Sequence, residues 1–434
     1  MSRTGAKNVR ISFSAGRLTH FGGVYLLHRF LQTLQLRTFL CVRLRMNERN
    51  NFFSSTERLF SVLYPMILGL NTIECSALLG ANGVFQYLTG IPRFPNPTTI
   101  RRFLVRTSGT LLPKLRTAHN LLRSRFLALP SIRSSFWLDF DSTAKTLYGH
   151  QEGVVKGYNP GHPGRKSYHP LVCTEAHLKD VLGGGLRYGN AHTADGVTDM
   201  FQEVVALLPH TARLRVRADA GFFSGDFVKE ISSKANFAVV APVYRFLKLR
   251  LPGLSYKRMN DVESTAEFRH QPHRWEKPYR FVVLREKLTE KRREQLTLFT
   301  SKAYAYHMIA TNLDLTPYGV FSFYQDRTGL ERIIRTLKDD YPFGKAPTKQ
   351  FDPNATHAEL SLLSYNLMIW FRRLCLPDDW QSYSIEILRR RLFSIPGEFT
   401  RTGNRPMLKL PKNSPYQDEF LCALERIKKL SSLV

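Results

Sequence analysis

Four acidic residues of this sequence lie in segments where carboxylates can bind metal ions. Asp139 and Asp141 lie in "DFDST", Asp219 lies in "RADAGF", and Glu331 lies in "YQDRTGLERIIRTLK". The interval from Asp141 to Asp219 is 78 residues (219 − 141), and that from Asp219 to Glu331 is 112 (331 − 219). Hard divalent cations such as Mg²⁺ take oxygen ligands and need only one or two carboxylates each beside substrate phosphate. These acids are therefore candidate metal ligands.

Two such ions, held a few Å apart, catalyse phosphoryl displacement. They activate a water or a hydroxyl and stabilise the oxygen that leaves. Three carboxylates from two strands and a helix would form a suitable cage, and basic side chains nearby would contact the flanking phosphates. Any one of these acids alone is more often a turn residue or a surface charge. Their joint pattern favours the metal site.

The segment Tyr324–Lys338 predicts one amphipathic helix. On such a helix Tyr324, Arg327, Glu331 and Lys338 fall within a sector about 60° wide. A neighbouring apolar stripe would be buried, formed by Leu330, Ile333, Ile334 and Leu337. The charged sector is either a solvated face or a carboxylate held for a metal among groups that bind phosphate.

The elements that must position these residues indicate an α/β fold. Strands are predicted at "FWLDFDST", "SYHPLVCTEA" and "VLGGGLRYG", followed by a helix, a strand, a helix and a strand up to "FAVVAPV". This order predicts a mixed central sheet flanked by helices. Residues 131–243 would form the first part of this core, 244–315 a β-rich insertion, and 316–376 the closing helices.

The region 1–130 is predicted to be helical and basic, and the region 377–434 is also basic. Asn96 is a plausible N-cap before Pro97, and the helix that follows shows Arg101 and Arg102. Eight basic residues and no acid lie between Arg101 and Leu138. The outline resembles a helix-turn-helix, which favours DNA contact through Arg101 and Arg102; the alternative is a helical bundle with a basic face.

The charge of the whole chain favours a polyanionic partner. The chain of 434 residues has 63 Lys and Arg against 35 Asp and Glu, a formal net charge of +28. Nucleic acid is the usual partner of so basic a protein, although ribosomal proteins and binders of anionic membranes share the trait. The five cysteines are scattered without a CxxC pair, which argues for a reducing compartment. No apolar run predicts a membrane span, so we expect a cytoplasmic protein.

These motifs together resemble the insertion-sequence transposases of the DDE superfamily, in the group named for its Tyr-Arg-Glu-Lys signature. More narrowly, they resemble the branch designated thirteen-eighty. "LDFDST" with "GHQEGVVKGYNPGHPGRKSYHPL" is similar to the first acidic motif, "VRADAGFFS" to the second, and "YQDRTGLERIIRTLK" to the third. "LSYNLMIWFRR" and "RRRLFSIPGEFTRTG" resemble the usual C-terminal segments.

The resemblance implies an RNase H-like core with a β-rich insertion, and Mg²⁺-dependent excision and re-insertion of a DNA element. Asp141, Asp219 and Glu331 would bind the metal, two ions in all, for which Mn²⁺ can substitute. Asp139 shares a sheet face with Asp141 and is the alternative first ligand; Asp141 is preferred because Ser142 and Thr143 follow it, as in the family.

The resemblance also implies the contacts with DNA. Tyr324, Arg327 and Lys338 would hold phosphates at the end of the element. Trp275 would stack on a displaced base, unless it is an ordinary strand tryptophan. The partners would be the terminal inverted repeats and target DNA in the nucleoid, and pairing two ends implies a dimer on DNA.

Two other classes of function remain open at this point. One is a DNA-binding protein derived from a transposase that has lost catalysis, although all three acids and the signature residues are present. The other is a two-metal nuclease of the same fold that cuts DNA without strand transfer.

Overall fold

The chain is described by a computed structural model over residues 9–46, 52–288 and 304–430. It divides into two compact units. Residues Met1–Ile100 and Phe371–Val434 form the terminal unit, and Arg101–Trp370 form the central unit. Both ends of the sequence therefore belong to one unit. Residues 289–303, which fall in the predicted β-rich insertion, lie outside the described residues.

The terminal unit is mainly helical. Its principal elements are β1 (Leu18–Thr19), α1 (Val24–Thr33), α2 (Leu36–Leu44), α3 (Ser55–Ile67), α4 (Ser76–Gly80), α5 (Gly83–Thr89), α14 (Ile385–Leu388), β14 (Gly397–Thr402), β15 (Arg405–Lys409) and α15 (Gln417–Leu430). Strands β1, β14 and β15 form a small sheet in that order. Buried Arg389 donates hydrogen bonds to the carbonyl oxygens of Met66 and Ile67 in the last turn of α3. Part of the C-terminal positive charge therefore caps a helix.

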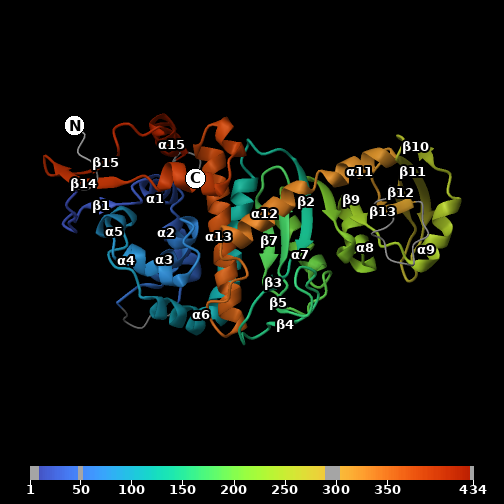
Figure 1. Ribbon diagram of the computed structural model, residues 1–434, viewed down its shortest axis with the longest axis horizontal. Coiled ribbons are helices and arrows are strands. Elements are labelled where there is room, and N and C mark those ends of the chain that lie inside the picture. Colours follow the sequence, from blue (N-terminus) through green and yellow to red (C-terminus); the bar gives the residue numbers. More distant parts are fainter. Residues whose placement is uncertain (1–8, 47–51, 289–303, 431–434) are drawn as a thin grey trace. The chain divides into compact units, whose positions relative to one another are not determined.

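The central unit is organised around one nine-stranded sheet in the order β10–β11–β12–β13–β9–β8–β2–β6–β7 (Figure 1). The strands are β2 (Ser135–Ser142), β6 (Leu171–Glu175), β7 (Val181–Gly185), β8 (Arg213–Ala218), β9 (Asn236–Val240), β10 (Lys257–Arg258), β11 (Glu263–His270), β12 (Tyr279–Lys287) and β13 (Tyr304–Thr311). Strand β8 is parallel to β2 and β9, and the other neighbours are antiparallel. The predicted mixed sheet is confirmed.

Strands β10 to β13 continue this sheet, because β13 pairs antiparallel with β9. A separate small sheet follows β2 along the chain. It consists of β3 (Lys145–Thr146), β4 (Val155–Lys156) and β5 (Lys166–Tyr168) in the order β3–β5–β4.

The two faces of β2 carry different side chains, because successive residues of a strand point to opposite faces. One face joins the larger hydrophobic core together with α7 (Val197–Leu207) and α8 (Gly225–Lys234), through Phe136, Leu138 and Phe140. On the other face Trp137 packs against the cluster of α11 (Pro317–Gln325). Asp139 and Asp141 follow Trp137 at intervals of two, so they lie on the face that α11 covers.

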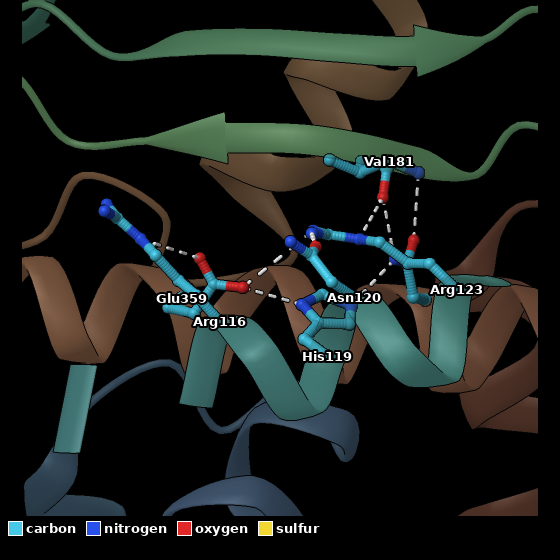
Figure 2. Close-up of polar contacts among 7 residues, drawn as sticks. Arg116, His119, Asn120, Arg123, Val181 and Glu359 are labelled. Atoms are coloured by element: carbon cyan, nitrogen blue, oxygen red, sulfur yellow. Dashed lines mark hydrogen bonds and ion pairs between the residues drawn. The ribbon is translucent and has the colours of Figure 1, made fainter. Parts of the chain in front are cut away.

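A buried polar network joins the long helices α6 (Pro97–Leu127) and α13 (Phe351–Cys375) within the central unit (Figure 2). His119 of α6 lies 2.7 Å from Glu359 of α13, measured from Nδ1 to Oε1. The guanidinium groups of Arg116 and Arg123 lie 3.8 and 3.9 Å from the Glu359 carboxylate. The Asn366 amide donates to His119 Nε2 and to the backbone carbonyl of Val181, the first residue of β7.

These contacts make His119 neutral. Because Asn366 donates to Nε2, that nitrogen accepts, and the proton of the ring lies on Nδ1. The pKa of His119 is lowered to about 4, mainly by burial and also by the charge of Arg123, with Glu359 opposing the shift. Burial alone would raise the pKa of Glu359, but His119, Arg123 and Arg116 outweigh burial and lower it.

We expect the protein to lose stability as the pH falls from about 6.5 to about 4. Over this range the unfolded chain binds a proton that folded His119 excludes, so protonation favours unfolding. At about 1.4 kcal/mol per pKa unit, His119 accounts for at most about 3.5 kcal/mol. His28 and His357 have pKa values lowered by burial to about 4 and about 3, and act in the same direction.

Urea unfolding of the wild type and of His119→Gln across this pH range measures the effect. The variant retains the other two histidines and is expected to lose less stability on acidification. Equal pH dependence of the two proteins would contradict a neutral, proton-excluding His119.

Candidate active site

The segment Tyr324–Lys338 forms two helices, so the prediction of one continuous helix was wrong. Helix α11 ends at Gln325, and α12 runs from Thr328 to Asp339. Between them Asp326 and Arg327 have ψ angles of −2° and −4°. The α-helical value is about −42°, so the helix is interrupted at these two residues. The predicted apolar stripe of α12 is nevertheless buried: Leu330, Ile333, Ile334 and Leu337.

Asp141 lies on β2, and Asp219 directly follows the last residue of the neighbouring parallel strand β8. The register pairs Phe140 of β2 with Ala218 of β8, and each aspartate is the next residue along the chain. Each carboxylate accepts a hydrogen bond from the backbone that follows it. Asp141 accepts from the N–H of Ser142 at 2.8 Å, and Asp219 accepts from that of Gly221 at 2.9 Å. Both side chains are therefore oriented by the backbone that directly follows them.

Glu331 brings a third carboxylate to this edge of the sheet. It is exposed in the first turn of α12, where the helix dipole favours negative charge. Burial raises the pKa of Asp141 to about 6; Arg327 opposes the shift, and the negative charges of Asp219 and Glu331 add to it. The three acids therefore interact electrostatically, although no group of three potential ligands within the described ranges is close enough to form a ready-made metal cluster.

Arg327 and Tyr324 lie beside Asp141. The Arg327 guanidinium is 3.7 Å from Asp141 Oδ1 and donates to the carbonyl oxygen of Phe140. It also donates to the Tyr324 hydroxyl at 3.3 Å. Burial raises the pKa of Tyr324, so its phenol stays protonated at neutral pH and keeps a proton to donate. A guanidinium and a phenol are thus fixed next to the acids.

Lys338, near the end of α12, reaches the segment that follows Asp141. Its Nζ donates to Thr143 Oγ1 at 3.1 Å and to the Ala144 carbonyl at 3.2 Å. Burial lowers the pKa of Lys338, and the charge of Lys145 lowers it further. The signature residues therefore lie around Asp141 and the segment that follows it: Tyr324 on α11, Arg327 at the junction, and Glu331 and Lys338 on α12. Their roles remain predictions.

Asp139, the alternative first ligand, is engaged in a buried ion pair. Arg217 of β8 donates from Nε to Asp139 Oδ1 at 2.7 Å and from a terminal nitrogen to Oδ2 at 2.8 Å. Both side chains are 1% exposed. The remaining terminal nitrogen of Arg217 donates to the Phe323 carbonyl of α11 at 2.8 Å. Both oxygens of Asp139 are occupied, which favours Asp141 as the ligand.

Two positioning residues, Arg217 and His169, were not predicted from the sequence. Arg217 lies two residues before Asp219, as Asp139 lies two residues before Asp141, and this matched spacing was the available signal. Buried His169 lies 2.8 Å from the carbonyl of Ala191 through Nδ1, which must therefore carry the proton. Its Nε2 then accepts from the Ser142 hydroxyl at 3.1 Å, which fixes the chain just beyond Asp141.

The remaining predicted DNA contacts lie on other elements. Trp275 lies in the turn between β11 and β12, so the interpretation as a strand tryptophan was wrong. Its ring packs 4.8 Å from that of Phe223 and lines a cavity of about 290 Å³. On α6, Arg102 is exposed, and Arg101 donates to the Pro347 carbonyl at 3.1 Å.

The donor set of this site fits a hard divalent cation such as Mg²⁺. Asp141, Asp219 and Glu331 supply only oxygen ligands, which these ions prefer. Burial is the main cause of the raised pKa of Asp141 and repulsion from Asp219 and Glu331 adds to it; a bound cation would offset that repulsion. The N–H and O–H donors of Arg327, Lys338 and Tyr324 suit phosphate oxygens. The arrangement is therefore suited to phosphoryl transfer.

The sequence matches the family described as transposase DDE domain group 1 over residues 1–432. The chain belongs to this family. It is therefore a transposase, and DDE transposases generally use divalent metal ions to act on DNA.

Among solved structures, this transposase is similar to a piggyBac transposase synaptic complex with hairpin DNA, determined by cryo-EM. The two chains are 11% identical, with a TM-score of 0.47, and the similarity covers 86% of this chain and 79% of the other. No curated protein matches the sequence. In the part of the chain that the structure describes, no helix has the length and apolar character needed to span a bilayer.

Proposed function

We propose that this transposase cuts DNA at the ends of an insertion sequence and joins those ends to target DNA. Asp141, Asp219 and Glu331 would be the ligands of two Mg²⁺ ions, for which Mn²⁺ can substitute because it accepts the same oxygen ligands. The observation that carries the proposal is the electrostatic interaction of three carboxylates that come from β2, from the end of β8 and from α12.

The strand order of the central sheet supports an RNase H-like core. Antiparallel β6 and β7 lie on one side of β2, and parallel β8 and β9 lie on the other, with α7 and α8 in the connections. Asp141 and Asp219 then lie at the carboxyl ends of parallel strands, the usual ligand site of open α/β sheets. Tyr324, Arg327, Glu331 and Lys338 support membership of the Tyr-Arg-Glu-Lys group and its branch designated thirteen-eighty.

The residues around Asp141 would hold the reacting phosphate in place. When bound, two divalent ions would activate a water or a DNA 3′-hydroxyl and stabilise the leaving oxygen. Arg327 keeps an enclosed positive charge beside Asp141, and Tyr324 has a hydroxyl proton to donate to a phosphate oxygen. Lys338 adds an ammonium held at Thr143. At phosphorus, one P–O bond forms as the opposite one breaks, in line.

Further contacts would place the ends of the element. Arg101 and Arg102 would bind backbone phosphates from the basic helix α6, and Trp275 would stack on a displaced base. Holding two ends in one complex calls for at least two copies of the protein, so a dimer is expected on DNA. The reaction would take place at the nucleoid, in the cytoplasm.

Incubating the protein with DNA that carries the terminal inverted repeats flanking its gene tests the proposal. We expect cleavage at the repeats only with Mg²⁺ or Mn²⁺, and joined products when a target plasmid is present. Binding without cleavage in either ion would overturn catalysis and favour a DNA-binding derivative of a transposase. Cleavage that does not depend on the repeat sequence and yields no joined product would favour a nuclease.

A further inference from the structure

The small sheet β3–β5–β4 presents a basic surface that directly follows Asp141 along the chain. From Gly153 to Thr174 the sequence contains no acidic residue, but it contains three exposed cations, Lys156, Arg165 and Lys166. The acid that precedes this stretch is Glu152, whose carboxylate accepts from the N–H of Phe351 at 2.9 Å. The three cations outnumber this one acid, so the surface carries a net positive charge.

Lys156 and Lys166 lie directly opposite each other on β4 and β5. Side chains in such pairs have Cβ atoms about 4.5–5.5 Å apart, and like charges at this spacing destabilise a sheet. Both lysines are exposed. A pair of this kind costs stability in the free protein, and a bound polyanion relieves the repulsion.

Tyr158 lies two residues beyond Lys156 and is connected to the acidic site through His169. The Tyr158 side chain is 69% exposed, and its ring centroid lies 6.5 Å from that of His169. His169 accepts the hydrogen bond of Ser142, the residue next to Asp141. The exposed Tyr158 ring is thus connected, through His169 and Ser142, to the residue next to the candidate metal ligand Asp141.

The backbone on both sides of Tyr158 is anchored. A Cβ at Gly157 would lie 1.8 Å from the carbonyl oxygen of Gly189, so only glycine fits this close approach. Asn159 is buried and donates to Thr146 Oγ1 of β3 at 3.0 Å. The Tyr158 ring is therefore exposed on a fixed backbone, which lowers the entropy lost when a partner stacks on it.

We propose that the β3–β5–β4 sheet binds unpaired nucleotides of the DNA strand that enters the active site. Tyr158 stacks on a base, and Lys156 and Lys166 pair with backbone phosphates. The proposal rests on the proposed function only in taking DNA as the substrate. Aromatic stacking beside a cationic groove is how proteins hold single strands, whereas the bases of a duplex are covered by their own stack.

Fluorescence anisotropy with labelled oligo(dT), alone and annealed to oligo(dA), tests the stacking contact. Full-length protein in EDTA is titrated, so that no cleavage occurs. Stacking on one aromatic ring contributes a factor of about 5 to 150 in affinity. Tyr158→Ala is expected to weaken single-strand binding at least about fivefold and duplex binding by less than about twofold.

Tyr158→Phe is the matched control, because it keeps the ring and removes only the hydroxyl. It is expected to bind oligo(dT) like the wild type. A loss as large as that of Tyr158→Ala would overturn the stacking contact, as would wild-type affinity in Tyr158→Ala.

The double variant Lys156→Gln/Lys166→Gln tests the phosphate contacts. Each lost contact with a single strand lowers the slope of log affinity against log salt by about 0.7. We expect a decrease of about 1.4, together with an unchanged or higher unfolding temperature because the like-charge pair is gone. An unchanged slope would overturn the contacts. Absence of Mg²⁺-dependent cleavage would defeat the proposed function but leave these binding measurements intact.

Discussion

Replacing Glu331 by glutamine is expected to abolish metal-dependent cleavage while DNA binding and folding persist. Glutamine keeps the volume of the side chain in the first turn of α12 but removes its charge, and Glu331 is exposed, so the core is undisturbed. Bound metal ions contribute several kcal/mol to phosphoryl transfer, and about 1.4 kcal/mol corresponds to a tenfold rate. We therefore expect a loss of about 10³-fold or more in the cleavage rate of inverted-repeat DNA.

Asp326→Asn is the matched control for Glu331→Gln. Asp326 is an exposed acid at the junction of α11 and α12, and its replacement changes the net charge of the protein by the same amount. This variant is expected to cleave at the wild-type rate. Cleavage by Glu331→Gln at a rate close to that of Asp326→Asn would show that Glu331 is not a metal ligand.

Replacing Asp139 by asparagine is expected to destabilise the protein by about 3–5 kcal/mol. Arg217 would then remain charged and buried without its carboxylate partner, since arginine does not lose its proton in proteins. The pair also sets the register of β2 against β8, where Asp139 lies opposite Arg217, and so brings Asp141 next to Asp219. Urea unfolding in metal-free buffer measures the loss.

Asp141→Asn is the matched control, two residues along the same face of β2. Because burial and neighbouring acids raise the pKa of Asp141 to about 6, the folded protein favours a neutral side chain at this position. This variant is expected to unfold at the same or a higher urea concentration, with a gain of at most about 3 kcal/mol, and to lose cleavage. Similar destabilisation by both variants would contradict the separation of a structural acid from a functional one.

A double variant tests whether the unpaired charge of Arg217, and not the loss of the Asp139 side chain itself, destabilises Asp139→Asn. Asp139→Leu with Arg217→Met removes both charges and fills most of the volume, as replacements of buried ion pairs with apolar residues can do. It is expected to recover part of the stability that Asp139→Asn loses. No recovery would contradict the explanation that Asp139→Asn loses stability because Arg217 is left buried without a carboxylate partner.

Alternation along the strands predicted much of this site. It predicted β2 and β8, and it placed Asp139 and Asp141 on one face. It did not indicate that Asp139 pairs with Arg217, because that contact depends on the register of strands 78 residues apart. The bond between His119 and Glu359 was also missed, because it depends on how two helices pack whose contacting residues lie 240 residues apart in the sequence.

Helical periodicity was less informative about where helices begin and end. The break at Asp326 and Arg327 changes ψ by only about 40° from the helical value and involves no proline or glycine, so no sequence signal marks it. Asn96 does cap α6, since its Oδ1 accepts from the N–H of Thr98 at 2.8 Å. This helix is 31 residues long and continues through Pro113.

The composition of the terminal unit has a consequence for the order in which the protein folds as it is made. Its first 100 residues leave the ribosome early, but β1 has no strand β14 to pair with until residues 371–434 follow. At about 5–20 residues per second, the first helices wait roughly twenty seconds to a minute. The central unit emerges complete in that interval, so the middle of the chain can fold before its beginning. A ribosome that stops within α13 would release a chain in which β1 lacks its strand partner β14 and α1 lacks the helix α15 that it contacts.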